Sequence, residues 1–478
     1  MSRRSIEPTT ASAVALLAGD RTTVSHGGAV VTGVSDDSRT VLPGDIFFCI
    51  RGSVTDGHTA AAAAVAYGAT ALVVDHVLGD VPGDVAQVVV PDVRPVVGPI
   101  VSALTGNPAS RMRMVAVTGT NGKTSTAHFI AGILGAAGRR TKVIGTLSGL
   151  RTTPEPVELH SQLADALAEG VDTVVMEVSS HALVLGRVDG IVFDVAVFTN
   201  LSRDHLDFHG TMEDYFAAKA SLFTAGRTRS AVVNTGDTHG RRIADACTVP
   251  LVTYSVADAQ DLRVGPASVS FVWRGEPVSA PVGGRFMAEN LIAAATAASA
   301  CGLDAAAVSR ACGGLGPVPG RHESVPTGGE YSVIVDYAHT PEALASLLAS
   351  VRAVAAGRVI VVFGCGGDRD RGKRPEMGAV AAAGADIVIV TSDNPRNESP
   401  GAIIGEITAG MRGTGAEVET QEDRAAAIAS AIGRAGSGDI VVVAGKGHEP
   451  YQEVAGVYVP FSDVEVARVA IERRSTAR

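Results

Sequence analysis

Beyond residue 110, short runs of β-branched and other apolar residues alternate with longer stretches of helical periodicity. Such alternation is typical of parallel sheets built from strand–helix–strand units. We therefore predict an α/β fold with largely parallel sheets. The strands are expected at residues 114–118, 172–178, 193–198, 331–336, 358–363, 385–390 and 439–444.

Polar and glycine-rich stretches follow these apolar runs almost every time. They read TGTNGKTS, SSH, TNLSRDH, YAHTP, GCGGDRDRGKRP, TSDNPR and GKGHE. In open parallel sheets, ligands bind outside the carboxyl ends of the strands. The pattern therefore predicts functional sites formed by these loops.

Two clusters of glycine and proline, at residues 104–113 and 313–324, interrupt the pattern, and we see no internal repeat. A chain of 478 residues is too long for one ordinary hydrophobic core. We predict a smaller N-terminal α/β domain (1–110), a central parallel-sheet domain (111–320) and a C-terminal Rossmann-like domain (321–478).

Composition narrows the class of protein. A net charge of -10 argues against a general nucleic-acid or membrane-surface binder, so an anionic ligand must be held locally. The five cysteines lack C-x-x-C spacing and are expected to be free thiols in a reduced compartment. The N-terminal residues lack an apolar signal-peptide region, so we expect a cytoplasmic protein without membrane insertion.

Residues 117–126, VTGTNGKTST, lie between a predicted strand and a helical run, which is the context of a phosphate-binding P-loop. Lys123 can reach phosphate oxygens, and the hydroxyl of Thr124 can hold Mg²⁺. The first glycine of the general motif is replaced by Val117. The motif alone therefore leaves a nucleotide site and a glycine-rich turn as alternatives.

Several other side chains have both a structural and a chemical interpretation. Glu177 ends a predicted strand, where it can be solvated, cap a helix or bind Mg²⁺. His205 can be a structural histidine or a metal ligand. Lys219 can be a surface lysine or a buried amine of lowered pKa. Arg369 and Arg396 can be surface charges or can bind a carboxylate through the guanidinium fork.

The combination of motifs resembles the Mur ligase family, the ATP-dependent amide-forming enzymes of peptidoglycan synthesis. The resemblance extends over essentially the whole chain. It rests on TGTNGKTS, MEVSSH, TNLSRDHLDFHG, DSRTVLPGDIFFCIRG, YFAAKASLF, VDYAHTP, FGCGGDRDRGKRP, DNPR and GKGHE. Within the family, the chain is similar to the enzymes that add the third amino acid of the stem peptide.

The resemblance implies ATP and Mg²⁺ as cofactors and identifies their ligands. The implied ATP-binding residues are Gly119, Thr120, Asn121, Gly122, Lys123, Thr124, Ser125, Asn290, Arg321, Asp336 and His339. The implied magnesium ligands are Thr124, Glu177, His205 and Lys219, the last as a carbamate formed with CO₂. Lys123, Lys219, Glu177 and His205 are the implied catalytic residues.

The resemblance also implies that the N-terminal domain binds the nucleotide of UDP-N-acetylmuramoyl-L-alanyl-D-glutamate, whose dipeptide extends to the central domain. The implied contacts are Ser38, Ser53, Val54, Thr55, Thr152, Thr153, Ser179 and Arg187. By its residue type alone, Ser38 is equally suited to capping a turn. The sequence departs from the family pattern at Arg151 and Leu185, where relatives can carry polar amides.

The C-terminal domain is implied to bind the added amino acid. The implied contacts are Arg369, Asp393, Asn394, Pro395, Arg396, Gly445 and Glu449. The arginines and the glutamate suit a ligand with both a carboxylate and an ammonium group. A site built to pair a charged group rejects the analogue that lacks it. We therefore expect Arg396 to select meso-2,6-diaminopimelate over L-lysine.

The implied reaction begins when the γ-carboxylate of D-glutamate attacks the γ-phosphate of ATP. The amine of diaminopimelate then displaces phosphate from the acyl phosphate. Closure of the third domain would exclude water from this intermediate, with residues 313–321 as the candidate hinge. A monomer is expected.

Alternatives remain at this point. One is a lysine-adding or other Mur ligase, and another is an amide ligase of the folylpolyglutamate synthetase type, which lacks the nucleotide-sugar domain. A third, from a different class, is a P-loop regulatory or motor ATPase. Such an ATPase would turn over ATP without any amino acid.

Overall fold

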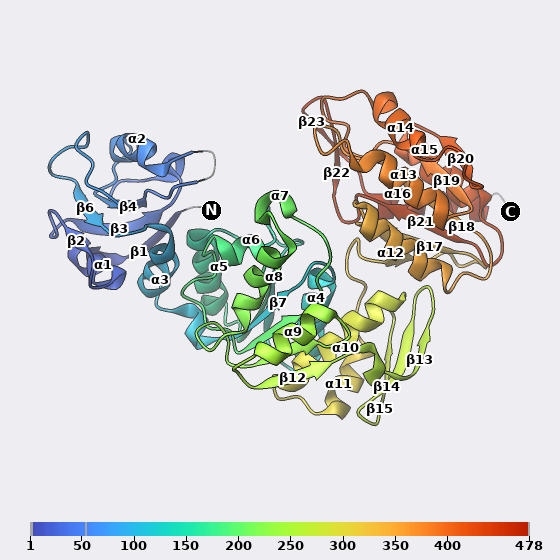
Figure 1. Cartoon of the computed structure of the whole chain (residues 1–478), viewed down its shortest axis with the longest axis horizontal. Helices are drawn as coiled ribbons and strands as arrows, with labels where there is room; N and C mark the ends of the chain where they lie inside the picture. Colours follow the sequence, from blue (N-terminus) through green and yellow to red (C-terminus); the bar gives the residue numbers. More distant parts are fainter. Residues whose placement is uncertain (1–2, 53–54, 477–478) are drawn as a thin grey trace. The chain divides into compact units, whose positions relative to one another are not determined.

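The computed structural model describes residues 3–52 and 55–476. The described residues form five β-sheets, with helices between the strands (Figure 1). None of the described helices is long and apolar enough to span a bilayer. The predicted α/β class is confirmed.

The first sheet belongs to the N-terminal part of the chain and has the strand order β1-β3-β4-β5-β6-β2. Its strands are β1 (Arg3–Thr10), β2 (Thr23–Val24), β3 (Val30–Ser35), β4 (Asp45–Phe48), β5 (Ala71–Val74) and β6 (Ala86–Val89). Its helices are α1 (Ala11–Ala18), α2 (Ala61–Ala66) and α3 (Arg94–Leu104). The four inner strands are parallel, and both edge strands are antiparallel to their neighbours.

The central sheet is parallel throughout and has the order β12-β11-β10-β7-β9-β8. Its strands are β7 (Arg113–Thr118), β8 (Thr141–Ile144), β9 (Thr173–Glu177), β10 (Val195–Phe198), β11 (Ala231–Asn234) and β12 (Leu251–Tyr254). Its helices are α4 (Lys123–Ala136), α5 (Pro156–Ala168), α6 (Ser180–Val184), α7 (Leu206–His209), α8 (Met212–Ala220) and α9 (Thr238–Ala246).

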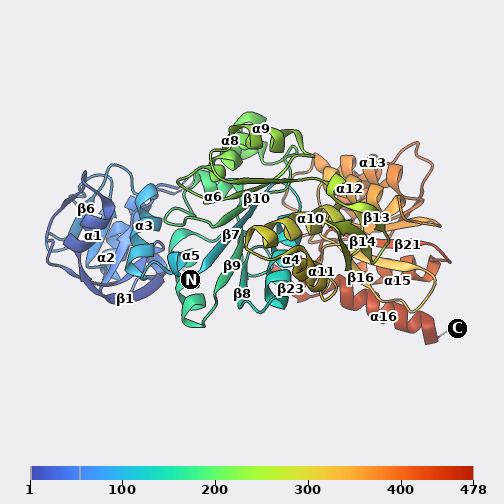
Figure 2. The same cartoon turned by 90° about the horizontal axis from the view of Figure 1, so that it is seen from below.

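Strand β7 lies between β9 and β10, as Figure 2 shows. The chain extends from β7 first to β8 and β9 on one side and later to β10 on the other. Ligands bind at such a reversal of strand order, outside the carboxyl ends of the strands. The residues after β7 therefore occupy the position where an open α/β sheet forms its binding site.

A small antiparallel sheet follows, with β13 (Gln260–Val264), β14 (Val269–Trp273) and β15 (Glu276–Ala280). Helices α10 (Arg285–Ala300) and α11 (Ala305–Cys312) come next. The last large sheet has the order β16-β17-β21-β18-β19-β20, and only β16 is antiparallel to its neighbour.

The elements of this C-terminal part are as follows. Its strands are β16 (Glu323–Val325), β17 (Ser332–Asp336), β18 (Val359–Phe363), β19 (Ile387–Val390), β20 (Glu417–Thr420) and β21 (Ile440–Ala444), with a hairpin of β22 (Tyr451–Val454) and β23 (Val457–Pro460). Its helices are α12 (Pro341–Arg352), α13 (Lys373–Gly384), α14 (Pro400–Ala409), α15 (Arg424–Arg434) and α16 (Asp463–Thr476).

Strand β18 shows why the apolar runs in the sequence are unbroken. Side chains alternate between the two faces of a strand, and here helices cover both faces. Val361 and Phe363 pack with α12, α13 and α14. Ile360 and Val362 pack with α15 and α16. Every position of the strand is therefore buried.

All seven predicted strands are present. Strand β7 begins one residue earlier than predicted, the other six begin one or two residues later, and β9 also ends one residue earlier. The contacts divide the chain into two compact units, residues 1–255 with 293–303 and residues 256–292 with 304–478. The candidate hinge 313–321 lies wholly within the second unit, where a Cβ on Gly320 would meet His448 N at 2.1 Å. All five cysteines are free, and only Cys247 among them is not fully buried.

Candidate functional site

The loop between β7 and α4 has the strand–loop–helix context that a P-loop requires. Gly119 and Gly122 adopt φ values of 152° and 84°, and a Cβ on Gly119 would lie 1.9 Å from Thr199 Oγ1. Lys123 begins α4, and its Nζ donates to Gly119 O at 2.9 Å. Val117, which departs from the general motif, still belongs to the strand, so the loop itself keeps its glycines.

A carboxylate lies beside the first turn of α4. Glu177 is 1% exposed, and its Oε2 accepts a hydrogen bond from Thr124 Oγ1 at 3.0 Å. Its Oε1 accepts from Thr146 N at 2.8 Å, and Thr146 Oγ1 lies 3.0 Å from Thr152 Oγ1. A Cβ on Gly145 would come within 2.2 Å of Oε1, so the backbone closely surrounds this carboxylate. Thr146 is a member of the site that the sequence did not reveal.

Lys219 lies on α8 and is 1% exposed. Its Nζ donates to Gly119 O at 2.8 Å and lies 4.7 Å from the centre of the Tyr215 ring. Burial, assisted by the positive charge of Lys123, lowers the pKa of Lys219 well below its usual value. The alternative of a surface lysine is therefore excluded, and the amine lies directly against the P-loop.

His205 precedes α7 with φ 53° and lies 4.8 Å, ring centre to ring centre, from His181. Burial lowers the pKa of His205, and the positive charges of Lys123 and Lys219 lower it further. Burial also lowers the pKa of His181 to about 4. A group of imidazoles, with His209 as its third member, thus lies close to Lys123 of the P-loop and Lys219 of α8. The sequence indicated only His205.

The residues predicted to contact the dipeptide gather at the carboxyl end of β9. Thr153 Oγ1 donates to Glu177 O at 2.9 Å and accepts from Ser179 N at 3.1 Å. Ser179 also caps α6. Arg187 Nη2 forms an ion pair with Glu155 at 2.7 Å. These hydroxyls and the arginine therefore have partners inside the protein that hold the wall of the site in place.

The predicted nucleotide-sugar residues are only partly described. Ser38 begins a short 3₁₀ helix whose capping side chain is that of Asp37, so Ser38 is not the cap. Thr55 is exposed in the loop before the second 3₁₀ helix of this domain. Ser53 and Val54 lie outside the described residues.

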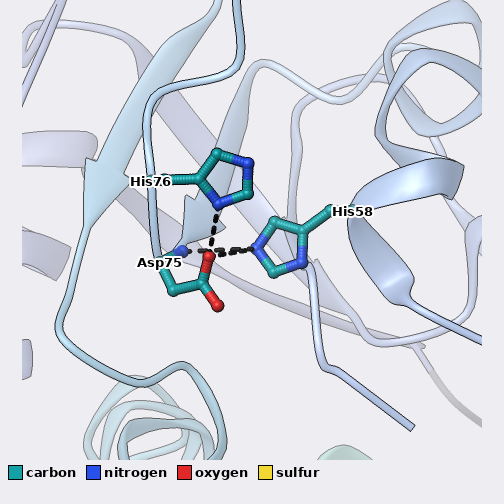
Figure 3. A group of neighbouring side chains, drawn as sticks. All are labelled: His58, Asp75 and His76. Atoms are coloured by element: carbon teal, nitrogen blue, oxygen red, sulfur yellow. Dashed lines mark hydrogen bonds and ion pairs between the residues drawn. The ribbon is translucent and has the colours of Figure 1, made fainter.

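A polar cluster adjoins that loop (Figure 3). His58 Nδ1 lies 2.6 Å from Asp56 Oδ1, and its Nε2 accepts from Asp75 N at 3.3 Å. His76 Nδ1 lies 2.5 Å from Asp75 Oδ1, while Arg51 Nε lies 2.7 Å from Asp75 Oδ2. Both oxygens of the Asp75 carboxylate therefore have protein partners. The cluster joins Arg51, Asp56 and His58 to the residues that follow β5.

Four residues predicted at the ATP site, Asn290, Arg321, Asp336 and His339, lie in the second compact unit. Asp336 ends β17, accepts from His322 N at 2.7 Å, and has a pKa raised by burial. The guanidinium of Arg321 lies 4.5 Å from the centre of the Tyr337 ring. His339 Nδ1 lies 2.8 Å from Tyr337 O. Three of the four thus gather at the end of β17, while Asn290 is buried on α10.

The loops after β19 and β21 meet at the carboxyl edge of the C-terminal sheet. Lys446 is fully buried, and its Nζ donates to Asn394 Oδ1 at 3.0 Å and to Glu449 Oε2 at 3.1 Å. Asn394 Nδ2 donates to Glu449 Oε2 at 2.8 Å. A Cβ on Gly445 would lie 2.7 Å from Asp393 Oδ2. Four of the predicted residues, Asp393, Asn394, Gly445 and Glu449, are therefore close to Lys446, which the prediction did not include.

Arg396 is four-fifths buried, which excludes a fully solvated surface charge. Its Nε donates to Glu453 Oε2 at 3.0 Å and its Nη1 to Gly367 O at 2.7 Å. Pro395 before it is buried, whereas Arg369 is exposed. Glu453 comes from β22, far from the DNPR motif in sequence, and no local pattern indicated it.

Comparison with known families identifies this set of domains. A model described as the Mur ligase middle domain matches residues 117–298. The glutamate ligase domain of Mur ligases matches residues 320–447, and the model described as the Mur ligase family catalytic domain matches residues 30–105.

Individual proteins match over almost the full length. The UDP-N-acetylmuramoyl-L-alanyl-D-glutamate–2,6-diaminopimelate ligase of Streptomyces avermitilis is 44% identical over 475 residues, 93% of each chain. The protein of that name from Geobacillus thermodenitrificans is 41% identical, over 94% of this chain and 96% of that one. A solved structure of a protein of that name has a TM-score of 0.68 at 38% identity, over 92% and 95% of the two chains. The chain belongs to the Mur ligase family.

Proposed function

We propose that this protein is an ATP-dependent ligase of peptidoglycan synthesis. It joins meso-2,6-diaminopimelate to UDP-N-acetylmuramoyl-L-alanyl-D-glutamate and forms ADP and phosphate. Residues 1–110 are assigned to the nucleotide sugar, 111–320 to ATP, and 321–478 to the amino acid. The protein works as a monomer in the cytoplasm.

The observation that carries this proposal is the group of side chains around the P-loop. The hydroxyl of Thr124 is bonded to the buried carboxylate of Glu177, and the buried amine of Lys219 is bonded to Gly119 O. A P-loop ATPase without ligase activity does not account for the dipeptide wall at Thr153 and Arg187. The likeness to diaminopimelate ligases over more than 90% of the chain also weighs against it.

The donor atoms beside the P-loop fit Mg²⁺. This ion prefers hard oxygen ligands, and Glu177 and Thr124 offer a carboxylate and a hydroxyl in one place. The ion would be held by these two groups, with His205 and Lys219 as further ligands. When bound, Mg²⁺ neutralises charge on the phosphate oxygens during phosphoryl transfer.

Lys219 is proposed to carry a carbamate. The neutral amine is the form that reacts with CO₂, and burial lowers the pKa of this amine. The amine nitrogen would bond to the carbon of CO₂ and release one proton to solvent, so that a neutral amine becomes an anionic oxygen ligand. His181 and His205, whose pKa values burial lowers, stay neutral near pH 7 and add no positive charge to the site.

The protein side chains then have distinct tasks. The backbone N–H groups of the loop from Gly119 to Thr124 bind phosphate oxygens, and Lys123 neutralises charge in the transition state. Thr153 and Arg187 orient the dipeptide so that the D-glutamate carboxylate faces the γ-phosphate. Glu449 receives the amine of diaminopimelate, and Arg396 binds its distal carboxylate.

The test is ADP release by the purified protein with ATP and the muramoyl-dipeptide nucleotide, comparing diaminopimelate with L-lysine at equal concentration. Strong turnover with diaminopimelate alone is expected. Arg396→Ala should reduce kcat/KM for diaminopimelate by about 100-fold or more, because the distal carboxylate loses its bidentate partner. Its effect on the weak turnover with lysine should be small.

Other results would point to the alternatives. Preference for lysine would refute the reading of Arg396 and leave a Mur ligase with another acceptor. Turnover with a folate and glutamate would indicate the folylpolyglutamate type. ATP hydrolysis that ignores every acceptor would support the regulatory ATPase.

A further inference from the structure

Arg396 uses only part of its guanidinium on protein acceptors. Nε donates to Glu453 Oε2 and Nη1 donates to Gly367 O. A guanidinium has five N–H groups. Within residues 3–52 and 55–476, no acceptor takes those of Nη2. The remaining N–H groups of Nη1 and Nη2 can therefore donate to the carboxylate of a ligand, which would approach the guanidinium end-on.

The backbone holds Glu453 in this position. Arg396 N donates to Glu453 O at 3.0 Å, and Ala455 N donates to Arg396 O at 2.7 Å. Glu453 N donates to Asn394 Oδ1 at 3.0 Å, and Gln452 Nε2 donates to Asp393 O at 2.9 Å. Arg396 itself has φ 51°, a conformation that persists in a non-glycine residue when its surroundings hold it. The hairpin of β22 and β23 and the DNPR turn thus form one bonded unit.

Two ion pairs lie at this turn. Arg396 and Glu453 are 21% and 20% exposed and form an ion pair, while Lys446 pairs with Glu449. A distal carboxylate that binds Arg396 is attracted by the guanidinium and repelled by Glu453. These four side chains together carry no net positive charge that would attract every anion equally.

We propose that Glu453 is a positioning residue that determines acceptor specificity by fixing the plane of the Arg396 guanidinium; this rests on the function proposed above. With Nε occupied by Glu453, only the Nη1–Nη2 edge is presented to a ligand. A carboxylate is then bound well at one distance from the reacting amine, and shorter or longer dicarboxylates are bound less well.

Two substitutions in the full chain separate the negative charge of Glu453 from its role as a hydrogen-bond acceptor for Arg396 Nε. Glu453→Gln keeps an oxygen acceptor for Nε but removes the negative charge, so KM for diaminopimelate should fall about fivefold with kcat unchanged. Glu453→Leu removes the acceptor and frees the guanidinium, so this KM should rise about tenfold. Glu453→Leu should also narrow the preference for diaminopimelate over 2,5-diaminoadipate, the diamino dicarboxylate one methylene shorter. KM for lysine should not change in either variant.

Controls distinguish this role from a structural one. Glu417→Gln removes one carboxylate from the exposed ion pairs of Arg434 in the same domain and should leave every KM unchanged. In an Arg396→Ala background, Glu453→Gln should no longer alter KM for diaminopimelate, because the two residues act through one contact.

Two results would overturn the inference alone. One is an unchanged KM for diaminopimelate in both Glu453 variants, and the other is an equal change for diaminopimelate and lysine. Absence of diaminopimelate-dependent turnover in the unaltered protein would instead overturn the proposed function, and this inference with it.

Discussion

The burial of Lys219 favours the neutral amine that the proposed chemistry needs, but it lowers the stability of the folded protein. Its amine is buried against Gly119 O, and Lys123 nearby disfavours its protonation further. A buried amine of lowered pKa costs stability wherever the unfolded chain would be protonated. The carbonyl of Gly119 also receives a hydrogen bond from Lys123, so the fold does not depend on Lys219 for that contact.

We therefore predict that Lys219→Met raises the melting temperature at pH 7 in bicarbonate-free buffer. The folded-state pKa of Lys219 lies below its unfolded value of about 10.4, so the stability deficit of the lysine disappears as pH rises toward that value. The gain should therefore be lost at pH 10 and above, while ligase activity falls at least about 100-fold at any pH. Calorimetry would measure the melting temperature and ADP release would measure the activity. Lys142→Met, at a partly exposed lysine, is the control. A lower melting temperature at pH 7 would contradict the prediction.

His160 makes the stability of the folded protein decrease at acidic pH. Burial lowers the pKa of this imidazole to about 4, although its hydrogen bond to Asp189 O at 3.1 Å acts in the opposite direction. A histidine that is kept neutral by the fold contributes stability above its unfolded pKa, near 6.5. That contribution is lost as pH falls from about 6.5 toward 4.

The second prediction concerns His160→Gln, which can still donate to Asp189 O. The urea midpoint of this variant should fall less steeply between pH 6.5 and 4 than that of the unaltered protein. Between pH 6.5 and 4, the free energy of unfolding should fall by at most about 3 kcal/mol less in the variant, since one pKa unit corresponds to about 1.4 kcal/mol. Urea titrations at pH 7.5, 6 and 5 would measure it. If the exposed control His26→Gln flattened the slope equally, His160 would not be responsible.

At the scale of elements, one buried ion pair joins three parts of the C-terminal sheet region. Arg424, at the start of α15, bonds Asp463 at the start of α16 through Nε and Nη2, both at 2.7 Å. Its Nη2 also donates to Ala444 O at the end of β21 at 2.9 Å. Both side chains are fully buried.

Removing one partner of such a pair leaves an uncompensated buried charge. Asp463→Asn should therefore lower the free energy of unfolding by about 3–5 kcal/mol. The double variant Arg424→Met, Asp463→Leu should regain most of that loss, because apolar groups of similar size need no partner. Chemical denaturation would compare them with Glu417→Gln in the exposed pair, for which less than about 1 kcal/mol is expected. A double variant no more stable than Asp463→Asn would contradict this account.

The sequence predicts the strands that form distinct apolar runs followed by polar loops, and it misses edge strands of mixed polarity and several short inner strands. The seven predicted strands are apolar runs, and most are buried on both faces. Strand β20 reads EVET and β8 reads TKVI, and as partly solvated edge strands both lack the uninterrupted apolar run. The short strands β4 and β5 have four residues each and lie among loops, so their apolar runs alone do not define a sheet.

The same distinction applies to the candidate site. The P-loop, Glu177 and Lys219 lie in local motifs, and the structure brings all three together. Thr146, Lys446 and Glu453 complete the polar networks through contacts across loops, and their roles depend on tertiary packing that no local spacing encodes.

At the scale of the whole molecule, the two compact units carry different parts of the proposed chemistry. The P-loop and the predicted dipeptide contacts belong to the first unit. The acceptor loops and the predicted ATP residues near Asp336 belong to the second. In the proposed function, the N-terminal part would bind the nucleotide, the central part ATP and the dipeptide, and the C-terminal part the amino acid and a portion of ATP.

The five cysteines differ in how accessible their thiols are in the folded protein. Burial raises the pKa of Cys49, Cys312 and Cys365 to about 12 and that of Cys301 to about 11, whereas Cys247 is only half-buried. Thiol reagents attack the thiolate of accessible cysteines. Ellman's reagent should therefore titrate one thiol rapidly in the native protein and all five in denaturant.

Rapid reaction of two or more native thiols would contradict this expectation. If it holds, the reaction of the four buried thiols with Ellman's reagent reports the fraction of unfolded molecules. It also leaves Cys247, at the end of α9, as a natural attachment point for a single fluorescent label, without engineering of the sequence.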